Sequence, residues 1–294
     1  MIRLFKSKLK MALAAALAVA AALGAWAFWL EPAWTSVRRV SLAVPGWRAA
    51  QGGLKVALLT DLHVGAPHMG AGRLRRVVEL TNAESPEVVI ITGDFVIGGP
   101  KDEGGERGGV AGGSFVEPEA IAAELKHLRA PLGVYAVLGN HDWWYDGPRV
   151  ARALESAGVR VLENQAVRVE RGGAGFWLGG VADLWTRRPD VAGALAQVTT
   201  DEPVILFTHN PDIFPGVPAR VSLTLAGHTH GGQVNLPLVG RPVVPSKFGR
   251  RYAMGHVVEG GRHLYVSGGV GTSILPVRFR VPPEVVVISL EELK

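Results

Sequence analysis

The 294-residue sequence predicts an α/β protein, a sandwich of two mixed sheets preceded by one N-terminal transmembrane helix. Three observations lead to this prediction. Residues 11–30 form an uncharged apolar segment near the N-terminus. From about residue 54 onward, apolar strand-like runs alternate with helix-like stretches, which indicates βαβ units. The later segments 159–181 and 264–290 are strand-rich without intervening helices, and they favour two mixed sheets over a single doubly wound sheet.

The apolar segment is long enough to cross a membrane. As a helix, residues 11–30 would span roughly 30 Å, the thickness of a bilayer core. Four basic residues precede the segment and aromatic residues cluster at its end, as is typical of the two membrane interfaces. A cleaved signal peptide is the alternative, although its apolar region is usually only about 7 to 15 residues long. We expect an uncleaved signal anchor that crosses the cytoplasmic (inner) membrane once, with the remaining chain on the extracytoplasmic side.

The net charge of +5 is concentrated around this segment. Residues 1–48 carry seven basic side chains and one acidic side chain, so the rest of the chain sums to about −1. A nucleic-acid-binding protein usually carries its basic patch on the folded domain. We therefore expect a membrane partner and no nucleic acid, which disfavours a nuclease. Nothing in the sequence indicates an obligate protein partner.

The predicted domains are a basic cytoplasmic flank (1–10), the anchor (11–30), a linker (31–51) and one folded domain (52–294). Within the domain we expect five strands, in 54–63, 88–95, 133–142, 203–211 and 222–230. Helices are expected at 73–83, 118–128 and 148–156. The segment 97–114 contains eight glycines, so we expect a loop there, either a disordered insertion or a lid over the site.

Each of the five strand-like runs ends in a polar cluster. Ligands of such sheets bind beyond the carboxyl ends of the strands, so these side chains should meet. A single strand-end Asp is often only a turn residue or a helix cap, but five similar endings in succession are hard to explain that way. The residues are Asp61, His63, Asp94, Asn140, His141, Asp142, His209, His228 and His230.

This set of side chains predicts a site for two metal ions. The chain has no cysteine, and oxygen and imidazole ligands suit divalent Mn, Fe or Zn. The set holds more such groups than one ion needs. Two ions about 3.5 to 4 Å apart can share a carboxylate, activate a bridging water and stabilise an in-line displacement at phosphorus. Glycines in "GHTHGG" (227–232) would let His228 and His230 face different ions.

The order of these motifs resembles the calcineurin-like metallophosphoesterase superfamily over roughly residues 52–291. The motifs are Asp-x-His, Gly-Asp, Gly-Asn-His-Asp, a strand-end His before Asn-Pro, and Gly-His-Thr-His-Gly-Gly. The resemblance implies a four-layer αββα sandwich. It implies a first ion bound by Asp61, His63, Asp94 and His230, and a second bound by Asp94, Asn140, His209 and His228. His141 would stay unligated and act on the leaving oxygen, with Asp142 orienting its ring.

The function that follows is hydrolysis of phosphodiester or pyrophosphate bonds by a metal-bridging hydroxide. The anchor, together with "LYVSGGVG" (264–271) and "RFRVPPEVVVISL" (278–290), resembles the bacterial membrane-anchored phosphodiesterase branch. That branch implies a cell-envelope lipid or a nucleotide-linked substrate. Two alternatives stay open: a hydrolase of the lipid A pathway related to the UDP-2,3-diacylglucosamine pyrophosphatases, and a non-catalytic metal-binding scaffold.

Some residues outside the motifs carry weaker expectations. Arg278 and Arg280 could contact a substrate phosphate, although an arginine there is more often a solvated surface residue. Trp143, Trp144 and Tyr145 could line a pocket for an apolar or ring-bearing group, or could pack over the loop or dip towards the membrane.

Overall fold

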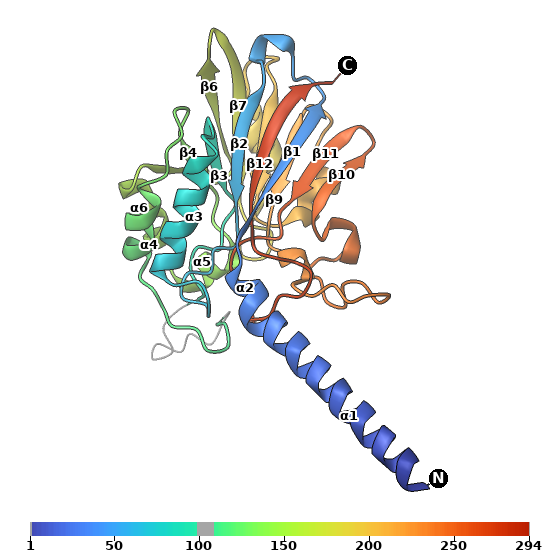
Figure 1. The fold of residues 1–294 in the computed structure, drawn as a ribbon. Coiled ribbons are helices and arrows are strands. Elements are labelled where there is room, and N and C mark those ends of the chain that lie inside the picture. Colours follow the sequence, from blue (N-terminus) through green and yellow to red (C-terminus); the bar gives the residue numbers. More distant parts are fainter. Residues whose placement is uncertain (1, 99–108, 294) are drawn as a thin grey trace.

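The computed structural model describes residues 2–98 and 109–293, and its folded domain contains two six-stranded mixed sheets packed face to face (Figure 1). The strand order in the first sheet is β1 (Ser36–Val44), β12 (Glu284–Glu292), β2 (Leu54–Leu59), β3 (Val88–Ile91), β4 (Val134–Ala136) and β5 (Val159–Val161). The order in the second sheet is β10 (Gly255–Glu259), β11 (Arg262–Val266), β9 (Leu223–Ala226), β8 (Val204–Thr208), β7 (Ala174–Val181) and β6 (Gln165–Arg171). The predicted pair of mixed sheets is confirmed.

Helices cover the outer faces of both sheets, which gives the layers α, β, β and α. The first sheet is covered by α3 (Ala71–Ala83), α4 (Pro118–Leu125) and α6 (Gly147–Ser156), which correspond to the three predicted helices. Their apolar side chains share one core with the inward-facing residues of that sheet. The second sheet is covered by the short α7 (Val191–Ala196) and the 3₁₀ turn Pro211–Gly216.

The apolar strand-like runs arise because the strands are buried on both faces. In β2, Ala57 and Leu59 pack in the core beneath the helices, whereas Val56 and Leu58 pack in the core between the two sheets. Successive side chains of a strand point to opposite faces, so a strand between two cores needs apolar residues at every position.

The N-terminal helical segment extends beyond the apolar residues 11–30 at both ends. It consists of α1 (Ile2–Ala25), a π-helical turn (Trp26–Leu30) and α2 (Glu31–Ala33), and it projects from one end of the sandwich (Figure 1). By length and composition, Phe5–Ala33 could cross a membrane. Its last turns contact the domain, because the carbonyl of Phe28 lies 2.8 Å from Nε2 of His68 and the Ala27 carbonyl accepts a 2.9 Å bond from the Arg278 N–H.

The linker prediction for residues 31–51 is wrong. Residues 36–44 form β1, which pairs in parallel with β12 from Ser36 opposite Glu284 to Val44 opposite Glu292. The prolines that flank this segment suggested a linker, but they lie just outside the two ends of the strand. Of the glycine-rich segment 97–114, residues 99–108 lie outside the described part of the chain. Ser114 is ordered against the domain, since its N–H donates to the Gly65 carbonyl at 2.8 Å.

The five strands that carry the polar motifs run in parallel groups. In the first sheet β2, β3 and β4 are parallel, and in the second sheet β7, β8 and β9 are parallel. Their carboxyl ends gather at the end of the sandwich where α2 and α5 (Asn140–Tyr145) lie and from which α1 leaves, whereas the C-terminus lies at the opposite end (Figure 1).

Candidate metal centre

The nine predicted site residues come together at this shared edge, and all of them are buried. Asp61 and His63 follow β2, Asp94 follows β3, and His209 follows β8. The remaining five residues lie in two groups, at the start of α5 and after β9: Asn140, His141, Asp142, His228 and His230. The two sheets thus contribute to one centre.

A first group of side chains converges around Asp61, His63 and His230. The Nε2 atoms of His63 and His230 lie 3.1 Å apart, and Asp61 Oδ1 lies 3.3 Å from His230 Nε2. Asp94 Oδ2 lies 3.4 Å from His63 Nε2. These four residues are the set expected for the first ion.

A second group converges on the other side of Asp94. Its Oδ2 lies 3.3 Å from His209 Nε2, which in turn lies 3.0 Å from Asn140 Oδ1 and 3.1 Å from His228 Nδ1. These are the four residues expected for the second ion. Asp94 is the only residue expected in both sets, and one of its oxygens faces both groups.

The arrangement of these nitrogen and oxygen atoms suits the coordination of divalent cations better than it suits hydrogen bonds among the side chains. Two neutral imidazole nitrogens that approach to 3.1 Å can share at most one proton, and this contact occurs in each group. Asp61 Oδ1 is buried and has no hydrogen-bond partner among the described residues. A buried carboxylate oxygen without a partner is costly, whereas a cation between these atoms would satisfy it.

Neighbouring groups fix the orientation of several of these side chains. The Thr92 carbonyl lies 2.7 Å from Nδ1 of His209, which places a ring proton on Nδ1 and turns Nε2 toward Asp94. Asp61 Oδ2 accepts bonds from the Thr60 hydroxyl at 2.7 Å and from the His228 N–H at 2.9 Å. The backbone thus restrains the polar side chains before any ligand is bound.

The backbone at the centre is strained. Asp61, His63, Asp94, His228 and His230 all have positive φ angles, between 44° and 68°. This region is uncommon for residues other than glycine, and such residues concentrate at functional sites. A side chain at Gly227 would overlap the Thr60 hydroxyl, and one at Gly139 would overlap the Asp94 carboxylate. These two glycines therefore permit a close approach of neighbouring loops.

Burial keeps most of the imidazoles neutral. It lowers the pKa of His63 to about 3, and it holds the pKa of His228 and His230 well below the ordinary range, each with help from neighbouring histidines. Burial also raises the pKa of Asp61 to about 6, assisted by the charge of Asp94. Neutral imidazoles with free lone pairs are the form in which histidine binds metal ions.

The sequence is similar to those of known metallophosphoesterases. The sequence profile of the calcineurin-like phosphoesterase family matches residues 54–232. The chain belongs to this family. Its members are metallophosphoesterases, hydrolases that act on phosphoric esters with divalent metals. Phosphodiesterase YaeI of Escherichia coli is 30% identical over 288 residues, which cover 95% of this chain and 96% of that relative.

Two further proteins that are similar to this chain are longer than it is. A Danio rerio protein named "Transmembrane protein with metallophosphoesterase domain" is 31% identical over 82% of this chain and 54% of that relative. Among solved structures, the Haemophilus influenzae NAD nucleotidase is 14% identical over 74% of this chain, with a TM-score of 0.47. The chain matches only 45% of the length of that nucleotidase.

The structure corrects the expected role of Asp142 in this phosphoesterase. Its carboxylate accepts bonds from the N–H groups of Gly139 and Asp94 at 2.9 Å, Phe95 at 2.8 Å and Val96 at 3.2 Å. It therefore joins the loop after β3 to the start of α5. The ring of His141 is positioned instead by the Ile97 carbonyl, which lies 3.2 Å from its Nδ1. Asp142 thus holds the loop that presents Asp94, and it makes no hydrogen bond to the ring of His141 among the described residues.

The structure also corrects the expectation for Arg278. Its side chain is fully buried and donates hydrogen bonds to the carbonyls of Gly268, Gly269, Gly271 and Val281. It is neither a surface residue nor free to contact a substrate phosphate. Arg280 is exposed. The sequence around Arg278 gave no sign of burial because its partners are loop carbonyls, which any residue type provides.

The three aromatic residues after His141 play different parts. The ring of Trp144 lies 4.9 Å from the ring of His141 and lines a cavity beside the centre. Tyr145 packs against Phe115. Sequence reasoning missed Trp185, whose ring lies 4.2 Å from that of His228. Trp185 follows β7, a sixth parallel strand that ends at the same edge, so the strand-end rule could have found it.

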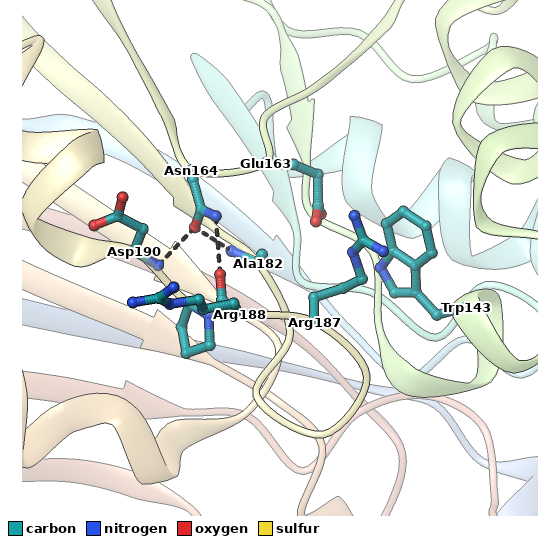
Figure 2. Close-up of a pocket in the computed structure, with 8 residues that line it drawn as sticks. Trp143, Glu163, Asn164, Ala182, Arg187, Arg188 and Asp190 are labelled. Carbon is teal, nitrogen blue, oxygen red and sulfur yellow. Dashed lines mark hydrogen bonds between the residues drawn. The ribbon is translucent and has the colours of Figure 1, made fainter.

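The domain has two cavities, and one of them borders the phosphoesterase centre. The first has a volume of about 610 Å³ and is lined by residues of both metal groups and by apolar loop residues. The second, of about 550 Å³, is lined by polar residues that include Glu163, Asn164 and Arg187 (Figure 2). Figure 2 shows the Arg187 side chain beside the ring of Trp143, and the guanidinium carbon lies 4.3 Å from the ring centroid.

Proposed function

We propose that this chain is a membrane-anchored phosphodiesterase that binds two divalent ions and hydrolyses phosphodiester or pyrophosphate bonds. The two converging groups that share Asp94 carry this proposal. The first ion would be held by Asp61, His63, Asp94 and His230, and the second by Asp94, Asn140, His209 and His228. Bound there, the ions would lower the pKa of a water molecule and neutralise charge at the phosphate.

His141 is the residue that we assign to the leaving group. Its Nε2 lies 4.0 Å from Asp94 Oδ2, at the edge of the two groups, while Nδ1 faces the Ile97 carbonyl. When both nitrogens are protonated, Nδ1–H donates to that carbonyl and Nε2–H is directed toward the centre. As water oxygen bonds to phosphorus and the ester P–O bond breaks, His141 would transfer the Nε2 proton to the departing oxygen.

The first test uses the full chain in detergent, stripped of metal and reloaded with Mn²⁺. We expect faster hydrolysis of bis-p-nitrophenyl phosphate than of p-nitrophenyl phosphate. Asn140→Ala should lower kcat/KM for the diester roughly a hundredfold or more and reduce the number of bound ions, because it removes one ligand of the second ion. Asn82→Ala, on α3 outside the centre, is the matched control. Unchanged hydrolysis by Asn140→Ala would refute the ligand assignment.

We also propose that residues 11–30 anchor the chain in the cytoplasmic (inner) membrane with the domain on the extracytoplasmic side. The basic residues before the apolar segment support this orientation, and the relative from Danio rerio is named a transmembrane protein. An alkaline phosphatase fused to the C-terminus should be active in intact cells. If the phosphatase fusion were inactive and a fusion to a reporter that works only in the cytoplasm were active, the proposed orientation would be reversed.

A further inference from the structure

The cavity beside the metal centre has one polar side and one apolar side. Its polar side is formed by residues of the two metal groups, including Asp94, Asn140 and His228. Its apolar side is formed by two loops, 233–245 and 273–277, which contribute Val234, Pro242, Val243, Ile274, Leu275 and Val277. A bound molecule that placed a phosphate at the centre would therefore have an apolar surface immediately next to it.

The first loop is held to residues 273–279 by hydrogen bonds. The Asn235 N–H donates to the Phe279 carbonyl at 2.9 Å, and the Phe279 N–H donates to the Gln233 carbonyl at 2.9 Å. The side chain of Gln233 adds a bond from the Ser273 N–H at 2.7 Å. These bonds fix the positions of the loops that form the apolar wall of the cavity.

The outer rim of these loops is also apolar, and it is exposed. Leu238 is fully exposed, Ile274 is 73% exposed and Val243 is 69% exposed. Leu238 and Ile274 have φ angles of 66° and 64°, a conformation that is costly for large side chains and especially for a β-branched one. Several exposed apolar side chains on two adjoining loops are typical of a surface that contacts a membrane or another apolar partner.

The position of the anchor identifies that partner as the bilayer. The segment that carries Ile274 and Leu275 continues to Arg278, whose N–H donates to the Ala27 carbonyl in the last turns of the apolar helix. Glu31, at the end of the helix, accepts a 2.6 Å bond from the Val281 N–H. The loops after β9 and β11 lie at the end of the sandwich from which α1 leaves (Figure 1). A helix that crosses the membrane would therefore hold these loops at the membrane surface.

We propose that the cavity binds the hydrocarbon tail of a membrane lipid phosphodiester, with the phosphate at the metal centre. This inference rests on the proposed function and names its substrate class. The lipid would enter from the bilayer past the exposed rim of Val243 and Ile274. Each methylene that the apolar wall removes from water adds about fourfold to binding.

The test compares two diesters with the same leaving group, hexadecyl p-nitrophenyl phosphate and methyl p-nitrophenyl phosphate. The full chain is placed in phosphatidylcholine nanodiscs with Mn²⁺. We expect kcat/KM for the hexadecyl diester to exceed that for the methyl diester at least a hundredfold. The double variant Val243→Asn, Ile274→Asn should lower the hexadecyl value at least tenfold and leave the methyl value within twofold. Asparagine adds no charge, and it tolerates the positive φ of residue 274 better than isoleucine does.

Val258→Asn is the matched control, because Val258 is 53% exposed on β10 and does not line the cavity. Its hexadecyl rate should equal that of the unchanged chain, which would exclude the loss of an exposed valine elsewhere on the domain as the cause of the effect. Equal values for both diesters, or a double variant with an unchanged ratio, would overturn the inference and leave the proposed function intact. Failure of the unchanged chain to cleave either diester would instead overturn the proposed function and this inference with it.

Discussion

Glu163 offers a test of electrostatics near the centre that does not involve a predicted metal ligand. It lines the polar cavity of Figure 2, where its Oε1 accepts a 2.9 Å bond from the Leu138 N–H. Its Oε2 is buried and has no hydrogen-bond partner among the residues that the structure describes. Burial raises the pKa of Glu163 to about 7 from an ordinary value of 4.5, and the nearby Asp183 adds to the increase.

The sign of the effect follows from proton binding. The folded protein binds the Glu163 proton more tightly than the unfolded chain does, so this residue destabilises the fold once it ionises. Its contribution to the free energy of unfolding is fully present below pH 4.5 and is lost as the pH rises through about 7. The total loss is about 3 kcal/mol, of which about 2 to 3 kcal/mol falls between pH 5 and pH 8. Glu163→Gln carries no ionisable group and should escape this loss.

The assay is thermal unfolding of the full chain in detergent, followed by circular dichroism at pH 5 and pH 8 with saturating Mn²⁺. The difference in Tm between Glu163→Gln and the unchanged chain should increase by roughly 5 to 10 °C from pH 5 to pH 8. Glu170→Gln is the control, because the Glu170 side chain is 80% exposed. If the Tm difference for Glu163→Gln were the same at both pH values, the carboxyl would not be protonated by burial and the reasoning would fail.

Three further predictions concern the centre and its support. His141→Ala should lower kcat for diesters with an alkyl leaving group by roughly 10²- to 10⁴-fold and have a smaller effect with p-nitrophenolate, which needs no proton; equal losses would argue against proton donation. Arg278→Met should lower the free energy of unfolding by about 3 kcal/mol or more, because several buried carbonyls lose a charged donor, and urea titration would measure this loss. Chelation with EDTA should abolish diester hydrolysis and Mn²⁺ should restore it, whereas activity that survived dialysis against EDTA would contradict a metal-dependent reaction.

The sequence predicted the centre because its residues obey a local rule. Each motif directly follows an apolar run, and parallel strands bring their carboxyl ends to one edge, so the grouping of Asp61, Asp94 and His209 needed no long-range information. The strands were predictable because strands buried on both faces appear as continuous apolar runs. The two sheets were predicted from the strand-rich segments 159–181 and 264–290.

The remaining features depend on contacts between distant segments. Residues 36–44 form an edge strand only because β12, nearly 250 residues later, offers a parallel partner, and the flanking prolines favoured a linker. The four N–H donors to Asp142 belong to two separate loops, so the motif alone placed its carboxylate on the wrong neighbour. Specific partners of this kind are set by the tertiary fold and leave no periodic pattern in the chain.

The burial of Arg278 connects the apolar helix with the metal centre. The segment 268–271, whose carbonyls accept bonds from its guanidinium, also contacts the first metal group, because the Gly271 N–H donates to the Asp61 carbonyl at 2.7 Å. The Arg278 N–H in turn donates to the Ala27 carbonyl. Asp61 has a strained φ of 51°, which persists only where surrounding structure restrains it. A fragment that began at residue 31 would keep every proposed ligand and lose the Ala27 contact, so the apolar helix contributes to the order of the centre.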